Sequence, residues 1–300
     1  MDSVSTELSP AVVASSGGRL SAYIELTKPR IAFLLVLTSA AGFYLASAGG
    51  FNTILFIHSM VSITLLAFGV ATLNQWMERD IDPLMERTAG RPLPSGRVTP
   101  IEALVFGVVQ CVAAEAYLYF FVNPLTALLG LVVIVGYVLV YTPLKTRTSA
   151  STAIGAIPGA LPPLMGWTAA SDGITVGAWG LFAMQFLWQF PHFFAIAWMY
   201  RDQYKNAGIL MLPVVEPSGK MTFRQIVLFT IMLIPISIAP YIFGISGIYF
   251  AIGAALLGVW HLVESIRAAR SKSNKDARRL LLVTVLYLPI LFILMVLDKR

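Results

Sequence analysis

The sequence contains few charged residues and a single cysteine. Only 12% of its 300 residues are charged, about half the fraction in ordinary globular domains, whereas 57% are hydrophobic and the mean hydropathy is +0.78. Too few charges are present to keep the surface of a soluble domain hydrated, so the composition favours a polytopic membrane protein. Cys111 has no second cysteine to pair with, which excludes a disulfide-stabilised extracellular scaffold.

The first 22 residues are rich in Ser, Ala and Gly and carry the acids Asp2 and Glu7. They lack the apolar core behind a basic start that marks a secretory signal, and the acids argue against a mitochondrial presequence. We therefore expect a flexible N-terminal tail over residues 1–22, followed by one membrane-embedded domain over residues 23–300.

Nine apolar stretches are long enough to cross the hydrocarbon core of a bilayer, which takes about 20 helical residues. The sequence thus predicts an all-α polytopic membrane protein, with nine transmembrane helices bundled around a central cavity. The predicted spans are residues 31–49, 53–73, 101–121, 124–143, 151–170, 175–199, 223–243, 245–263 and 279–297.

The basic residues support these spans independently. Of the 21 lysines and arginines, all except Lys299 and Arg300 fall at or near connections on one predicted side of the membrane. Because cytoplasmic loops are enriched in such residues, we expect a cytoplasmic N-terminus, an external C-terminus and an active site at the cytoplasmic face. This topology accounts for the net charge of +6, so nothing in the composition supports a nucleic-acid partner.

An acidic segment continues directly from the second predicted span. Asn74, Glu78 and Asp82 are spaced four residues apart, so on a helix they share one face. Mg²⁺ takes oxygen ligands and is usually bound through one or two carboxylates together with substrate phosphates. A solvated loop of mixed charge is the alternative, and Pro83 disfavours helical geometry at Asp82.

Arginines surround this segment. Arg79, Arg87, Arg91 and Arg97 all lie in the same predicted loop. A guanidinium group binds phosphate through two parallel hydrogen bonds, so arginines beside carboxylates suit a metal-bridged diphosphate.

The stretch from Asn74 to Asp82 resembles the first polar motif of the UbiA superfamily of membrane prenyltransferases, in the Asn-Gln-x-x-Glu variant found in protoheme IX farnesyltransferases. The resemblance extends to further segments in the same order, from residue 23 to about residue 292. These segments are residues 23–30, 85–93, 141–145, 159–167, 188–193, 208–214 and 277–280.

The resemblance implies transfer of a farnesyl group from farnesyl diphosphate to the 2-vinyl group of heme B, with addition of water, to give heme O and diphosphate. It implies that Asn74, Glu78 and Asp82 hold Mg²⁺ and are catalytic together with Arg87 and Arg91. It further implies a bacterial plasma membrane and downstream partners such as a heme A synthase or terminal oxidase assembly.

A second polar segment, residues 200–205, departs from the family pattern. Gln203 stands where the family commonly has an Asp, and Asp202 lies one residue earlier, so Asp202 is a weaker candidate for a metal ligand. Ordinary loop charge is the alternative for the basic residues here. The candidates for binding the diphosphate are Arg30, Lys145, Arg201 and Lys205.

His192 lies within the sixth predicted span, beside Trp188 and Phe193. A polar residue at this depth is costly unless it faces the bundle interior. We therefore expect His192 in the acceptor pocket, in contact with heme iron or a propionate, with a hydrogen-bonded structural histidine as the alternative.

The sequence is compatible with two other functions. The acceptor of a UbiA-type enzyme can be a phenolic or quinone precursor, although the motif variant disfavours this. A secondary transporter is a different class, but transporters place their sites near the membrane midplane, whereas the acids here gather at one face.

Overall fold

The computed structural model describes residues 18–47 and 49–300. These residues form helices, with one isolated β-bridge between Ser246 and Lys299. The longer helices are α2 (Pro29–Ala46), α3 (Thr53–Met77), α5 (Pro100–Phe121), α6 (Pro124–Ile134), α9 (Leu161–Ser171), α10 (Val176–Met199), α13 (Lys220–Ile242), α14 (Ile248–Ser271) and α15 (Asn274–Leu297). The shorter ones are α1 (Arg19–Leu26), η1 (Asp82–Leu84), α4 (Glu86–Ala89), η2 (Val135–Tyr141), α7 (Thr142–Leu144), α8 (Ser151–Gly159), α11 (Arg201–Asn206) and α12 (Leu212–Val215).

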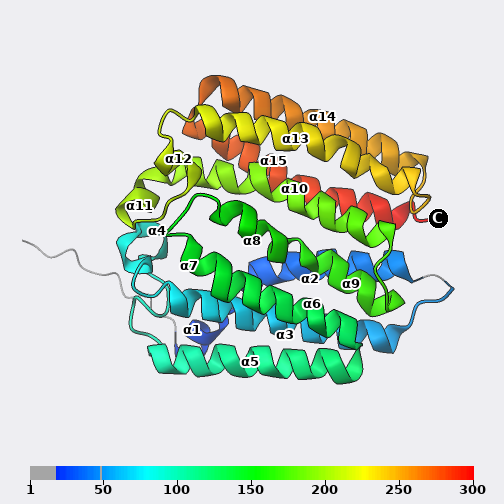
Figure 1. Ribbon diagram of the computed structural model, residues 1–300, viewed down its shortest axis with the longest axis horizontal. Coiled ribbons are helices and arrows are strands. Elements are labelled where there is room, and N and C mark those ends of the chain that lie inside the picture. Colours follow the sequence, from blue (N-terminus) through cyan, green and yellow to red (C-terminus); the bar gives the residue numbers. More distant parts are fainter. Residues whose placement is uncertain (1–17, 48) are drawn as a thin grey trace, which may run out of the picture.

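The long helices lie side by side as one bundle, as Figure 1 shows. The short helices α4, α11 and α12 gather at one end of the bundle, and the C-terminus lies at the other end (Figure 1). This arrangement confirms the predicted all-α polytopic fold. Because α4 and α11 carry charged residues and both lie at this end, charged side chains from distant parts of the chain meet there.

The predicted count of nine spans is not confirmed. In the described part of the chain, seven helical segments are long and apolar enough to cross a membrane. The fifth predicted span is divided into the short helices α8 and α9, and the sixth corresponds to α10, which is 24 residues long. Helix α10 is long enough to cross a membrane, but Gln185, Gln189 and His192 lower its mean hydropathy, so it is not among these seven segments.

The first described helix begins inside the segment predicted as a tail. Helix α1 begins at Arg19, four residues before the predicted boundary at residue 23. Residues 1–17 lie outside the described residues, so the prediction for them is not tested.

The break between α8 and α9 falls at Ala160, between Pro158 and Pro162. Prolines lack the backbone donor of a regular helix, so they interrupt its hydrogen bonding. The Ser39 hydroxyl of α2 donates to the Pro162 carbonyl at 2.8 Å, in the first turn of α9. Close approach of α2 and α9 needs Gly166, because an added Cβ there would collide with the Ser39 carbonyl oxygen.

Helix α3 extends one turn past the predicted span and ends at Met77. The chain then continues in helix-like turns, since the Glu78 amide donates to the Asn74 carbonyl at 3.1 Å and the Asp82 amide to the Glu78 carbonyl at 2.8 Å. Asp82 starts the short helix η1, with Pro83 at its second position. These helix-like turns therefore keep Asn74, Glu78 and Asp82 on one side of the backbone.

Between α6 and α7 the chain forms a seven-residue π-helix, η2. Such wide turns interrupt the regular α-helical register and are frequent at functional sites. Tyr137 and Tyr141 of η2 both face the central cavity, and the Thr142 hydroxyl donates to the Tyr137 carbonyl at 2.9 Å.

Candidate functional site

A cavity of about 410 Å³ lies within the bundle, as predicted. Its walls are formed by α2, α3, η2, α8, α9, α10 and α15. Apolar side chains such as Leu35, Leu66 and Leu288 line its depth, and charged side chains line it beyond the end of α3. The predicted site residues that line this cavity are Asn74, Glu78, Asp82, Arg87, Arg91, Lys145 and His192.

The two carboxylates are held by basic side chains. Lys145 Nζ lies 2.5 Å from Glu78 Oε1. The Nη1 atom of Arg91 donates to both oxygens of Asp82, at 2.7 and 2.8 Å, and lies 3.7 Å from Glu78 Oε2. Glu78 and Asp82 are both buried, so their charges need these partners.

The side-chain amide of Asn74 accepts a hydrogen bond from a lysine. Lys28 Nζ donates to Asn74 Oδ1 at 2.8 Å, while Asn74 Nδ2 donates to the Thr142 hydroxyl at 3.2 Å. Lys28 has a φ of 49°, in the left-handed region that a residue with a side chain adopts at a cost. This conformation at the start of α2 brings the amine to the end of α3.

The ionisation of the cluster follows from burial and from these pairs. Burial alone would raise the pKa of Glu78, but the ammonium groups of Lys145 and Lys28 hold it below its usual value. Burial likewise raises the pKa of Asp82, although Arg91 opposes the shift. Burial, reinforced by Arg91, lowers the pKa of Lys28 to about 7, whereas the Glu78 carboxylate outweighs burial and raises the pKa of Lys145.

The donor set fits Mg²⁺ bound together with a diphosphate. Two carboxylates and one amide oxygen converge, and the described residues contain no group of three or more His, Cys, Asp or Glu side chains that would hold a metal unaided. Mg²⁺ commonly completes its coordination with substrate phosphates and water. Lys28, Arg91 and Lys145 place positive charge at the same end of the cavity.

Arg87 is oriented by two aromatic side chains. Its Nη2 atom donates to the Tyr204 hydroxyl at 3.2 Å, and its guanidinium carbon lies 5.2 Å from the centre of the Tyr200 ring. Its backbone amide donates to Gln203 Oε1 at 3.3 Å. Gln203, the residue that departs from the family pattern, therefore supports the loop that carries Arg87.

Four predicted contacts lie away from the cavity in the structure. Arg30, Asp202 and Lys205 are exposed, and Arg201 donates to the Trp198 carbonyl at 2.7 Å and to Asn274 Oδ1 at 3.0 Å. On α11 the buried residue is Tyr204, which turns Asp202 and Lys205 toward the outside. These four residues therefore do not join the cluster formed by Glu78 and Asp82.

His192 is fixed against the wall of the cavity. Its Nδ1 atom lies 2.9 Å from the Thr284 hydroxyl, and its ring stacks on Trp188 with centres 4.8 Å apart. Trp188 in turn donates to the Thr284 carbonyl at 2.8 Å. With Nδ1 engaged, Nε2 is the ring nitrogen left to meet a ligand, so the hydrogen bond and the predicted binding role are compatible.

Sequence reasoning missed Lys28, Tyr137, Tyr141 and Tyr204, which all line the cavity. Lys28 lay in a segment already recognised, directly before the helix-starting Pro29, and this position could have favoured it over Arg30. Tyr141 precedes Lys145 by four residues, and its ring lies 4.5 Å from the Lys145 ammonium. The positions of Tyr137 and Tyr141 depend on η2, which leaves no periodic signal.

The model of the UbiA prenyltransferase family matches residues 35–293. The chain therefore belongs to the UbiA prenyltransferase family, which favours an enzyme over a transporter. It is similar to the protoheme IX farnesyltransferase of Solibacter usitatus (strain Ellin6076), with 46% identity over 286 residues that cover 92% of this chain and 98% of the relative. It is also similar to the protoheme IX farnesyltransferase of Koribacter versatilis (strain Ellin345), with 42% identity over 287 residues that cover 92% and 93%.

Solved structures share the fold at low identity. The structure of a digeranylgeranylglyceryl phosphate synthase has a TM-score of 0.78 and 17% identity, covering 93% of this chain and 98% of its own. A UbiA homologue from Archaeoglobus fulgidus, bound to DMAPP and Mg²⁺, has a TM-score of 0.68 and 16% identity, covering 91% and 98%. These likenesses confirm the architecture of a multi-pass membrane protein.

Proposed function

We propose that this protein transfers the farnesyl group of farnesyl diphosphate to the 2-vinyl group of heme B, with addition of water, giving heme O and diphosphate. The observation that carries the proposal is the single cavity that joins the Asn74, Glu78 and Asp82 cluster to an apolar interior walled by Trp188 and His192. Similarity to protoheme IX farnesyltransferases over nearly the whole chain supports heme as the acceptor.

The charged end of the cavity suits ionisation of the donor. Asn74, Glu78 and Asp82 would hold Mg²⁺, which when bound stabilises the charge of the departing diphosphate. Lys28 and Lys145, now held by Asn74 and Glu78, are within reach of the same phosphates. Fixed positive groups in a largely buried site stabilise charge as it develops without reorganising.

Carbon–oxygen cleavage leaves an allylic cation and diphosphate. The vinyl group attacks the cation through its terminal carbon, and the new positive charge next to the macrocycle is captured by water, which then loses a proton. The rings of Tyr137 and Tyr141 line the cavity beside the charged cluster, where they would shield a cation. The apolar side chains of α2 and α3 would receive the farnesyl chain, and Trp188 and His192 the macrocycle.

We also propose the cellular setting that follows from this reaction. The protein would lie in the plasma membrane with a cytoplasmic N-terminus and an external C-terminus, by the distribution of basic residues. Its partners would be heme B, farnesyl diphosphate and the lipid bilayer, with a heme A synthase or terminal oxidase assembly using the product.

The decisive experiment is mass spectrometry of the heme extracted after incubating purified protein with heme B, farnesyl diphosphate and Mg²⁺. A species heavier than heme B by a farnesyl group and one hydroxyl is expected, and it should be absent with a chelator and in Asp82→Asn. Full activity of folded Asp82→Asn would remove the metal assignment. Intact heme B from folded wild-type protein, with product formed on a phenolic acceptor in a parallel panel, would contradict the heme assignment.

A further inference from the structure

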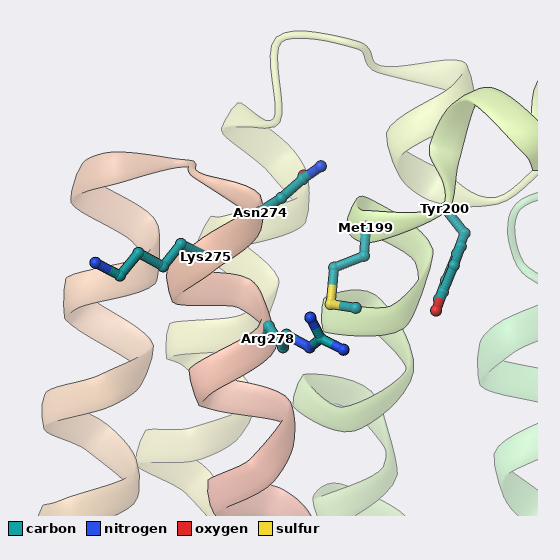
Figure 2. A pocket seen from close by; sticks show the side chains of 5 residues that line it. All are labelled: Met199, Tyr200, Asn274, Lys275 and Arg278. Atoms are coloured by element: carbon teal, nitrogen blue, oxygen red, sulfur yellow. The ribbon is translucent and has the colours of Figure 1, made fainter.

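A second, smaller hollow lies between the start of α15 and the end of α10 (Figure 2). It is lined by Met199, Tyr200, Asn274, Lys275 and Arg278. Figure 2 shows the Arg278 side chain extending from α15 toward Met199, whereas the Lys275 side chain points away toward the other side of α15. Of the two charged residues that line the hollow, Arg278 is therefore the one directed toward α10.

Arg278 has no carboxylate to neutralise it. In the described structure it forms no ion pair within 4.0 Å and no side-chain hydrogen bond, whereas the adjacent Arg279 lies 3.0 Å from Glu264 Oε2. Asn274 adds a second donor, because its Oδ1 atom already accepts from Arg201 and its amide NH₂ remains available. A planar guanidinium matches the two oxygens of a carboxylate, and the Asn274 amide lies one helical turn earlier on α15.

The hollow continues a wall of the main cavity. On α10, Ile196 lines the cavity, and Met199 and Tyr200 follow three and four residues later on the same helix face. On α15, Arg278 precedes the cavity residue Val285 by seven residues, which is two turns or about 10 Å of helix.

One aromatic ring lies between the hollow and a residue of the main cavity. Tyr200 lines the hollow, and its ring also lies under the guanidinium of Arg87, which lines the main cavity. The hollow therefore lies next to the part of the main cavity that Arg87 lines.

We propose that Arg278 and Asn274 form a subsite for the carboxylates of the acceptor. This inference rests on the proposed function, because heme B carries two propionates at the edge of the macrocycle opposite its vinyl groups. If the vinyl edge faces the cluster of Asn74, Glu78 and Asp82, the propionates face the opposite wall, which is the seam of α10 and α15. The hollow gives them a charged partner at the water-accessible end of the bundle, so they are not buried in the apolar depth.

A titration of the heme absorbance band tests this subsite in detergent-solubilised protein, using iron protoporphyrin IX and its dimethyl ester. Arg278→Gln is expected to raise the Kd for the free acid about tenfold, since it removes a charge-assisted pair. The ester is expected to bind wild type about as weakly as the acid binds the variant, and the variant should not weaken ester binding further.

The matched control is Arg270→Gln. Arg270 is an exposed arginine in the last turn of α14 at the same end of the bundle, and its replacement should leave both affinities unchanged. Arg278→Lys keeps the charge but loses the planar fork, so it should fall between wild type and Arg278→Gln and also guards against a folding defect.

Three outcomes would overturn the subsite. These are unchanged affinity for the free acid in Arg278→Gln, equal weakening of acid and ester, or an equal loss in Arg270→Gln. If Arg278→Gln keeps its heme affinity but loses co-purified anionic phospholipid, the hollow binds lipid headgroups instead. Failure of folded wild type to bind either porphyrin would contradict the proposed function itself, and so is distinguishable from failure of the subsite.

Discussion

The ammonium group of Lys145 lies 2.5 Å from the carboxylate of Glu78, so a predicted diphosphate contact is held by a predicted metal ligand. Two further basic side chains hold the other proposed ligands, because Arg91 donates to Asp82 and Lys28 donates to Asn74. Each oxygen-bearing side chain of the proposed metal site is thus partnered by a cation of the chain itself. An incoming diphosphate would draw these cations away and leave the oxygens for the metal.

Metal binding should therefore depend on diphosphate. We expect calorimetric titration with Mg²⁺ alone to give weak or undetectable binding, and titration with inorganic diphosphate present to give binding at least ten times tighter, on the order of 1.4 kcal/mol or more. Linkage requires the reverse as well, so Mg²⁺ should tighten diphosphate binding by the same factor.

Lys145→Met serves as the matched variant for this test. It frees Glu78 from its ion pair, so Mg²⁺ alone should bind more tightly than it does to wild type, whereas diphosphate should bind more weakly. If wild type bound Mg²⁺ equally well with and without diphosphate, diphosphate would not be drawing the basic side chains away from the metal-binding oxygens.

The sequence was sufficient to predict the bundle, its cavity and the juxtaposition of Asn74, Glu78 and Asp82. These features depend on the local spacing of residues and on hydropathy, both of which are visible in the sequence without the three-dimensional structure. Even the proline at position 83 altered only the local helix type, because backbone hydrogen bonds carry the turn onward.

Other parts of the site depend on three-dimensional detail that no spacing records. Lys28 replaces Arg30 in the cluster because the backbone takes a left-handed turn at Lys28. Asp202 and Lys205 point outward because burial of Tyr204 sets the rotation of α11. Hydropathy could not settle the number of spans, since the polar residues of α10 face the cavity and lower its average.

Lys28 is expected to lower the stability of the fold while its amine supports turnover. Lys28→Gly and Lys28→Ala both remove the amine, so both should lose at least 100-fold in turnover, equivalent to about 2.7 kcal/mol of transition-state stabilisation. Only glycine adopts a φ of 49° freely, so Lys28→Gly should be more stable than Lys28→Ala by about 1 kcal/mol.

Thermal unfolding in one detergent, read against turnover of the same preparations, checks this pair. Equal stabilities would show that the left-handed turn carries no cost. Near-normal turnover in either variant would remove Lys28 from the site.

His192 is expected to act on the acceptor alone. His192→Ala removes the ring that stacks on Trp188 in the cavity wall, so the Kd for heme B should rise about tenfold, or about 1.4 kcal/mol, while the Kd for farnesyl diphosphate stays unchanged. Thr284→Val removes only the partner of His192 Nδ1 and should give a smaller effect in the same direction. Equal weakening of both ligands in His192→Ala would show a purely structural histidine.

The contact of α2 with α9 gives a prediction about stability that is independent of the chemistry. In Gly166→Ala the new methyl group meets the Ser39 carbonyl oxygen, and backbone cannot yield as a flexible side chain does, so a loss of about 1–3 kcal/mol is expected. Gly180→Ala on α10 is the control, because open space surrounds that position and alanine favours a helix by up to about 1 kcal/mol. The two unfolding midpoints should therefore move in opposite directions from wild type. A Gly166→Ala protein as stable as wild type would mean that α2 and α9 separate at little cost. The hydrogen bond from the Ser39 hydroxyl to the Pro162 carbonyl would then contribute little to holding α9 against α2.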